Sequence, residues 1–148
     1  MMNIKKSTIS ALGATIALAA TVSIVLAGGK PFNILMNGAS EVPGPGDPDG
    51  SGNAHITLNQ GQGEVCYKLE VANITLPAIG AHIHEAPEGV AGPVIIPLTA
   101  PDVNGVSEGC VDNLEKDFVK EIRENPEEYY VNVHTSDHPA GAVRGQLK

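Results

Sequence analysis

The segment GEVCYKLEVANI, residues 63–74, constrains the fold most, because apolar and polar side chains alternate along it with a period of two. Apolar side chains stand at positions 65, 67, 69 and 71, and polar or charged side chains and a cysteine stand between them. Successive side chains of a strand point to opposite faces, so this alternation predicts an antiparallel sheet with one face on a core and one in water.

The composition and the frequent turn-forming residues extend this prediction to the whole chain. The chain has 17 Gly and 11 Pro among 148 residues, which indicates many turns within one domain, and its aromatic content of 3 % leaves the core to Val, Ile, Leu and Ala. Strand-like segments recur between turns, and VIIPL is predicted to be a buried run. Residues 44–53 are predicted to form a flexible loop in which nothing packs. Helical spacing of apolar residues occurs only within 113–129. We expect an all-β fold: a Greek-key antiparallel β-sandwich or flattened barrel, superoxide dismutase-like or immunoglobulin-like, with one short helix.

The N-terminus has the features of an export signal. Within residues 1–27, Lys5 and Lys6 precede an apolar, uncharged stretch over 9–27 that ends in small residues. The alternative is a retained membrane anchor, since the stretch is near the lower limit for crossing a bilayer. Both predict that the domain over 28–148 is secreted, periplasmic or extracellular, and that it touches a membrane only through an uncleaved N-terminal segment.

The charge of the chain limits its partners. The formal net charge is −8, and because residues 1–27 hold two lysines and no acid, the remainder carries −10. Such a domain repels phosphate backbones and anionic lipid surfaces and attracts cations. We therefore expect no nucleic-acid partner, and a metal ion is a more plausible ligand.

The chain has two cysteines, Cys66 and Cys110. In an exported protein an even pair predicts a disulfide. The alternative is two free thiols, one of them a soft metal ligand.

The histidines form the strongest candidate site. His82 and His84 stand two apart in GAHIHEA, so on a strand they share one face, and His134 in YYVNVHT alternates with apolar residues in the same way. If these strands are neighbours, three imidazoles converge, and imidazole-rich sites suit copper and zinc. The alternative is that these histidines pair with carboxylates on a solvated face and only stabilise the sheet. His138, in a turn beside Asp137, is a further candidate ligand or a group that holds another imidazole.

The C-terminal segment adds a cationic candidate. In AGAVRGQL, Val143 and Leu147 are expected to face the core, which turns Arg144 outward on the face of His134. There its charge would guide a small anion toward an open metal position.

Four motifs, NGASEVP, GEVCYKLEV, AHIHEAPEGVAGPVIIPL and YYVNVHTSDHPAGAVRGQL, together resemble the CHRD domain, a module named after chordin. The resemblance covers residues 32–148. It implies a secreted β-sandwich, and chordin's binding of growth factors implies an extracellular protein as another class of partner.

A second resemblance concerns the site. GAHIHEAPEG is similar to the strand of Cu,Zn superoxide dismutases whose two histidines bind copper. It implies His82, His84 and His134 as copper ligands and Arg144 as the guide for the anionic substrate. The loop that carries the bridging histidine and the zinc ligands in that family is missing, because only ten positions separate His84 from Val94.

Three functions are therefore open. The favoured one is a secreted CHRD-domain protein that binds a transition metal, copper ahead of zinc, through its histidine cluster. The second is a non-catalytic adhesion or protein-binding module. The third is a copper-only superoxide dismutase-like oxidoreductase.

Overall fold

The computed structural model describes residues 29–148, so the predicted export signal or anchor over residues 1–27 lies outside the described chain. No helix of the described part is long and apolar enough to cross a membrane. The elements, in chain order, are β1 (Lys30–Asn37), the short 3-10 helix η1 (Gly38–Ser40), β2 (Ser51–Asn59), β3 (Glu64–Ala72), β4 (Gly80–Glu85), β5 (Val94–Leu98), β6 (Val106–Val111), α1 (Lys116–Glu124), η2 (Pro126–Glu128), β7 (Tyr129–His134) and β8 (Val143–Gln146).

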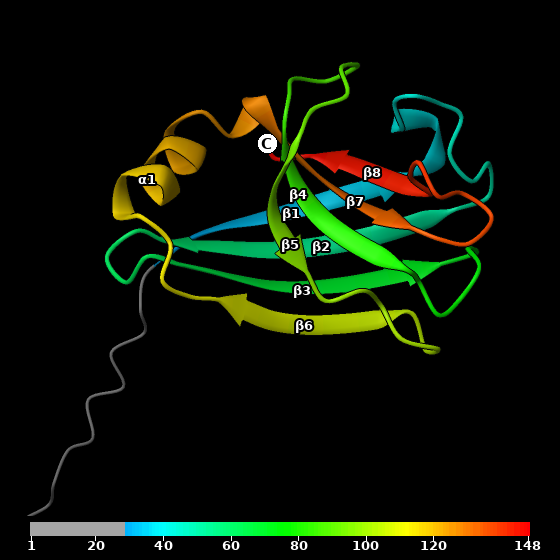
Figure 1. The fold of residues 1–148 in the computed structure, drawn as a ribbon, viewed down its shortest axis with the longest axis horizontal. Helices are drawn as coiled ribbons and strands as arrows, with labels where there is room; N and C mark the ends of the chain where they lie inside the picture. The colour runs from blue at the N-terminus through cyan, green and yellow to red at the C-terminus, as the bar shows by residue number, and fades with distance from the viewer. Residues whose placement is uncertain (1–28) are drawn as a thin grey trace, which may run out of the picture.

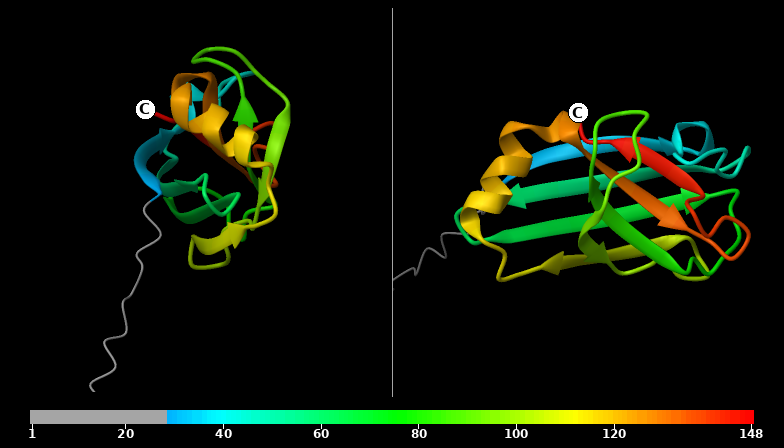
Figure 2. Two further views of the ribbon diagram at one scale, coloured as in Figure 1. Left: turned by 90° about the vertical axis from the view of Figure 1, so that its left-hand side faces the viewer. Right: turned by 45° about the horizontal axis from the view of Figure 1, so that its top comes forward.

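The strands form one antiparallel sheet in the order β5-β4-β7-β8-β1-β2-β3-β6 (Figure 1). The sheet curls so that β4, β5, β7 and β8 lie across the remaining strands, which gives a nearly closed, flattened barrel (Figure 2). One layer holds β1, β2, β3 and β6, and the other holds β4, β5, β7 and β8. The chain therefore passes from one layer to the other after β3, β5 and β6. For residues 29–148, this confirms the predicted all-β fold with one short α-helix.

The period of two decides which side chains enter the core. Along β3, every second residue from Val65 to Val71 is buried, and the residues between them are half-buried or exposed. β1 and β2 alternate in the same way, and together with β4, β7 and β8 they build a mainly aliphatic core. The helix α1 buries Val119 and Ile122 against one end of the barrel (Figure 1).

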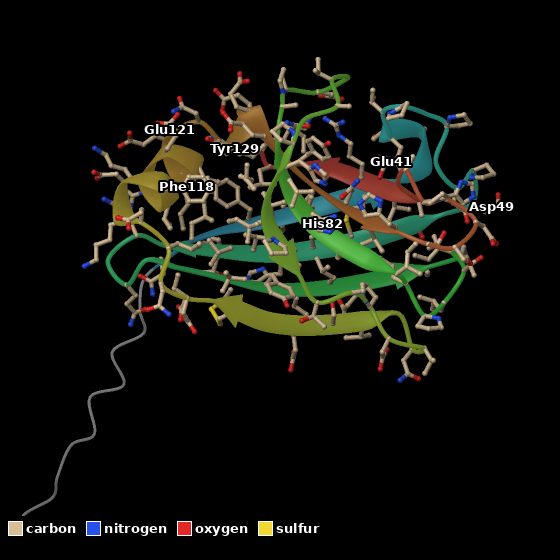
Figure 3. All side chains as sticks on the ribbon, viewed as in Figure 1. Glu41, Asp49, His82, Phe118, Glu121 and Tyr129 are labelled. Atoms are coloured by element: carbon tan, nitrogen blue, oxygen red, sulfur yellow. A yellow bond between two sulfur atoms is a disulfide. The ribbon has the colours of Figure 1, made fainter. Side chains whose placement is uncertain are left out.

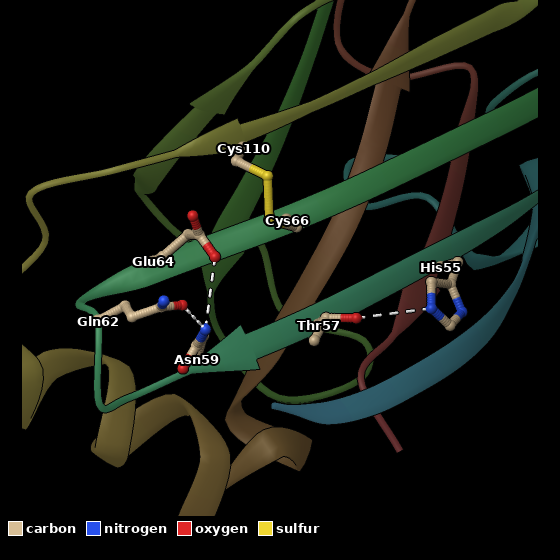
Figure 4. Close-up of a disulfide and its surroundings, with 7 residues drawn as sticks. All are labelled: His55, Thr57, Asn59, Gln62, Glu64, Cys66 and Cys110. Carbon is tan, nitrogen blue, oxygen red and sulfur yellow. Dashed lines mark hydrogen bonds between the residues drawn. A yellow bond between two sulfur atoms is a disulfide. The ribbon is translucent and has the colours of Figure 1, made fainter. Parts of the chain in front are cut away.

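The predicted disulfide is present. Cys66 on β3 and Cys110 on β6 are direct partners in the sheet register and are joined by an S–S bond of 2.06 Å (Figure 4). The bond links one edge strand of the sheet to its neighbour. Because both sulfurs are bonded, the alternative of a cysteine metal ligand is wrong.

The prediction that nothing packs in residues 44–53 is wrong. Gly46 and Gly50 are buried, and the backbone N–H of Asp47 donates to the carbonyl of Ala142 at 2.8 Å. A Cβ at Gly38 would lie 1.8 Å from the carbonyl oxygen of Asp47, so a glycine there lets the loop fold back onto η1. The last residues of the segment already belong to β2.

The prediction of a buried run at VIIPL is also wrong. β5 is an edge strand in which only Ile96 is buried, and Val94 is 48 % exposed. An edge position also accommodates Pro97, which has no backbone N–H to donate to a further strand.

Candidate metal centre

The pair His82 and His84 lies on β4, with both side chains on the outer face, which is the face of β4, β7 and β8 turned away from the core. Ala81 and Ile83, which alternate with them, are fully buried in the core. His82 is half-buried, whereas His84 is only 7 % exposed. Figure 3 shows His82 on β4 near the middle of this layer.

His134 joins the pair from the neighbouring strand β7. The register places Gly80 opposite His134 and His82 opposite Asn132, so the two histidines are diagonal neighbours. Gly80 leaves room for both rings, since a Cβ there would lie 3.3 Å from His82 Cε1 and 3.6 Å from His134 Cδ2. The distance from His82 Nδ1 to His134 Nε2 is 3.0 Å.

The three imidazoles therefore meet at one place, as the sequence predicted. One nitrogen from each ring lies within 4.8 Å of the other two. The ring centroid of His84 is 5.5 Å from that of His82 and 6.2 Å from that of His134.

Backbone carbonyls fix the tautomers of two rings. Nδ1 of His84 lies 2.9 Å from the Gly92 oxygen, and Nδ1 of His134 lies 3.1 Å from the Pro139 oxygen. A carbonyl oxygen only accepts, so each neutral ring carries its proton on Nδ1 and its lone pair on Nε2. His82 Nδ1 then donates to His134 Nε2, because that nitrogen has no proton to give.

One of these lone pairs has no partner. Nε2 of His84 is buried and makes no hydrogen bond within the described chain. Buried polar atoms are nearly always paired, so an orphaned acceptor beside two other imidazoles needs an explanation. A metal ion bound to it would supply the missing partner.

The surroundings of His82 and His134 favour the neutral form of each ring. Burial lowers the pKa of His82, and positive charge on His134 and His84 would lower this pKa further. Burial also lowers the pKa of His134, although the hydrogen bond to the Pro139 carbonyl acts in the opposite direction. Metals bind the neutral imidazole, so these shifts favour the binding form at neutral pH.

Arg144 lies on the predicted outer face of the sheet, but it is buried there rather than exposed. Its side chain is 1 % exposed, because the β4–β5 loop, residues 86–93, folds over this part of the outer face. The guanidinium donates to the carbonyls of Val90 at 2.8 Å and Pro87 at 3.0 Å. Its position therefore does not support a role as an exposed guide for anions.

The other two histidines lie apart from the cluster. Nε2 of His138 is 3.6 Å from the Asp47 carboxylate, so it faces the loop before β2, and it is not among the residues that converge. His55 is exposed on β2 and contacts Asn33 through Nδ1 at 2.8 Å.

The structure also reveals site residues that the sequence did not indicate. The Tyr130 ring stacks on His84 with a centroid distance of 4.6 Å and an interplanar angle of 7°. Asn132 lies between His82 and Arg144 in the register, and its Oδ1 is buried without a hydrogen bond to any described residue. The period of two already placed both on the outer face, but only the register shows that they are neighbours of the histidines.

Glu41 was missed as well. It follows η1 (Figure 3). It is 4 % exposed, and neither carboxylate oxygen has a hydrogen-bond partner within residues 29–148. Burial raises its pKa from 4.5 to about 7, and the nearby charge of Arg144 offsets part of this rise. In the sequence, only the position of Glu41 within the motif NGASEVP set it apart from other acidic residues.

The fold and the site define a class: a disulfide-linked antiparallel β-barrel with a cluster of three imidazoles on its outer face. The chain belongs to the CHRD domain family, whose model matches residues 32–147. Searches of curated proteins and of solved structures found no match. The resemblance to Cu,Zn superoxide dismutases therefore has no support from these comparisons.

Proposed function

We propose that this CHRD domain works outside the cytoplasm and binds one transition-metal ion, copper ahead of zinc, through His82 Nδ1, His84 Nε2 and His134 Nε2. The observation that carries the proposal is the buried Nε2 of His84, which has no hydrogen-bond partner among the described residues. It belongs to a cluster in which each of the three rings offers one nitrogen within 4.8 Å of those of the other two. The disulfide is consistent with an oxidising compartment.

The donor set decides the class of metal. Three neutral imidazoles suit copper and zinc, whereas magnesium and calcium prefer oxygen ligands. Copper ranks ahead of zinc because affinity for a given nitrogen site is highest for Cu²⁺ in the divalent series.

The hydrogen bonds indicate what binding requires of the protein. Two of the three ligand atoms, both Nε2, already carry lone pairs, and the backbone carbonyls of Gly92 and Pro139 hold their rings in that tautomer. The third ligand atom, His82 Nδ1, carries the proton donated to His134. For a metal ion to bind there, the proton of His82 would move from Nδ1 to Nε2 of the same ring, which keeps the imidazole neutral, and the other two rings would keep their tautomers.

The test is a competition titration of Cu²⁺ and Zn²⁺ into the protein with its disulfide intact. We expect one ion per chain, and we expect His84→Ala and His134→Ala to weaken binding by more than about 100-fold, because loss of an outer partner alone costs about 10- to 100-fold. His55→Ala is the matched control, since His55 is an exposed histidine of the same barrel.

Two outcomes would count against the proposal. Equal affinity of the wild type and His134→Ala would show that the two histidine strands do not form one site. Absence of binding by the wild type, with lower stability of the variants, would instead favour a module in which the histidines only stabilise the sheet.

A further inference from the structure

We infer that Arg144 is a positioning residue for the histidine cluster: it clamps the β4–β5 loop onto the outer face and, through the Tyr130 ring, holds His84 in the orientation and tautomer that leave Nε2 free for a metal ion. The metal-binding part of this inference rests on the proposed function, whereas the clamp itself is a property of the metal-free protein.

The first part of the clamp joins Arg144 to the loop. Nη1 donates to the Val90 carbonyl at 2.8 Å and Nη2 donates to the Pro87 carbonyl at 3.0 Å, so one guanidinium holds two points of the loop. Nη2 also donates to Gln146 Oε1 at 3.3 Å, and the Gln146 amide donates to the Ala86 carbonyl at 2.8 Å. The start and the middle of the loop are therefore fixed by side chains of β8.

In the second part, Arg144 and His84 both contact the Tyr130 ring. The Arg144 Cζ atom lies 3.4 Å from the centre of the Tyr130 ring, and the His84 ring lies nearly parallel to the same ring. Because β7 runs between β4 and β8, Tyr130 is contacted by a side chain from each neighbouring strand. Tyr130 itself is only 2 % exposed, so its ring has little freedom to move away from either contact.

The third part consists of the contacts of the loop residue Gly92 with His84 and Tyr130. The Gly92 carbonyl accepts the proton of His84 Nδ1, and the Gly92 N–H donates to the Tyr130 hydroxyl at 3.3 Å. The end of the loop is thus held by the two rings that form the stack. A displacement of the loop would remove the carbonyl that defines the His84 tautomer, and either ring nitrogen could then carry the proton.

The chemistry of arginine separates this role from a purely electrostatic one. A planar guanidinium with five N–H donors binds two carbonyls and stacks on an aromatic ring at the same time, and a lysine ammonium does not. Arg144→Lys keeps the positive charge but loses the fork and the flat stack. If Arg144 acts through its charge, the lysine variant keeps the His84 tautomer and the copper affinity of the wild type. If Arg144 acts as a clamp, the lysine variant resembles Arg144→Ala in both properties.

The decisive experiment observes the metal-free protein. Long-range proton–nitrogen correlation spectra of ¹⁵N-histidine-labelled protein report which ring nitrogen carries the proton. We expect His84 of the wild type to show a single tautomer protonated at Nδ1, and Arg144→Lys and Arg144→Ala to show a mixture. Lys148→Ala is the matched control, because Lys148 makes an exposed ion pair of 3.0 Å with Glu88 of the same loop.

The second arm titrates Cu²⁺ into the same proteins. We expect affinity to fall by about tenfold or more in both Arg144 variants and to stay unchanged in Lys148→Ala. A lysine variant that keeps the His84 tautomer and binds copper as the wild type does would overturn the inference. If the wild type binds no metal, the proposed function fails, and the tautomer measurement still decides whether the clamp exists.

A pair of tyrosine variants keeps the test decisive if the Arg144 variants do not fold. Tyr130→Phe retains the ring between Arg144 and His84 and loses only the hydroxyl that accepts from Gly92. Tyr130→Leu removes the stack. We expect Tyr130→Leu to lose the single His84 tautomer and Tyr130→Phe to keep it, and equal spectra for the two variants would contradict the role of the stack.

Discussion

Glu41→Gln should stabilise this protein at neutral and alkaline pH and have little effect in acid. Glu41 is 4 % exposed and neither carboxylate oxygen has a hydrogen-bond partner among the described residues, so its ionised form is poorly solvated in the folded state. Glutamine has nearly the same shape and no charge. The Arg144 charge, the Val42 backbone and the Asn132 side chain offset only part of the cost of burying the carboxylate.

The magnitude follows from the pKa of Glu41, which rises from 4.5 to about 7 on folding. A group with a raised pKa binds its proton more tightly in the folded state, so stability is highest below pH 4.5 and falls as the pH rises toward 7. A shift of this size corresponds to about 3 kcal/mol of unfolding free energy. Above pH 7 the wild type bears this whole cost, and the glutamine variant does not.

The assay is urea unfolding of both proteins with the disulfide intact, at about pH 4.5 and about pH 8. We expect the two unfolding free energies to be nearly equal at the lower pH and Glu41→Gln to be more stable by up to about 3 kcal/mol at the higher pH. Glu127→Gln, which removes an exposed carboxylate, controls for the general relief of negative charge. A difference between wild type and Glu41→Gln that is the same at both pH values would refute the reasoning.

Three further changes test other parts of the structure. Copper affinity, measured by competition, should decline only below about pH 6.5, because burial lowers the pKa of both His82 and His134; a decline that starts well above this pH would contradict the buried cluster. Replacing Cys66 and Cys110 by serine should lower the unfolding free energy by about 4 kcal/mol, since the bond closes a loop with a sequence separation of 44; urea unfolding measures this, and an unchanged midpoint would show that the bond is dispensable. Gly92→Ala should detach the β4–β5 loop and raise its rate of limited proteolysis, because a Cβ there would lie 1.9 Å from the Glu85 carbonyl oxygen; wild-type resistance would contradict the close approach.

The sequence by itself determined most strands and, where apolar and polar residues alternate, the two faces of the strand. Alternation over residues 63–74 placed Val65 and Leu69 in the core, and the same period placed His82 and His84 together on the opposite face of β4. This succeeds because the direction of a side chain on a strand is a local property of the backbone. The apolar neighbours of His134 likewise indicated its face, whereas the pairing of its strand with β4 is seen only in the structure.

Only the tertiary structure decided how that face is used. Residues 86–93 fold over the outer face, so Arg144 is buried beneath carbonyls rather than exposed, and Tyr130 lies between it and His84. The tautomers of His84 and His134 depend on carbonyls of the loops that hold Gly92 and Pro139. The positions of these loops follow from contacts between distant parts of the chain. A periodic pattern along one strand contains no information about them.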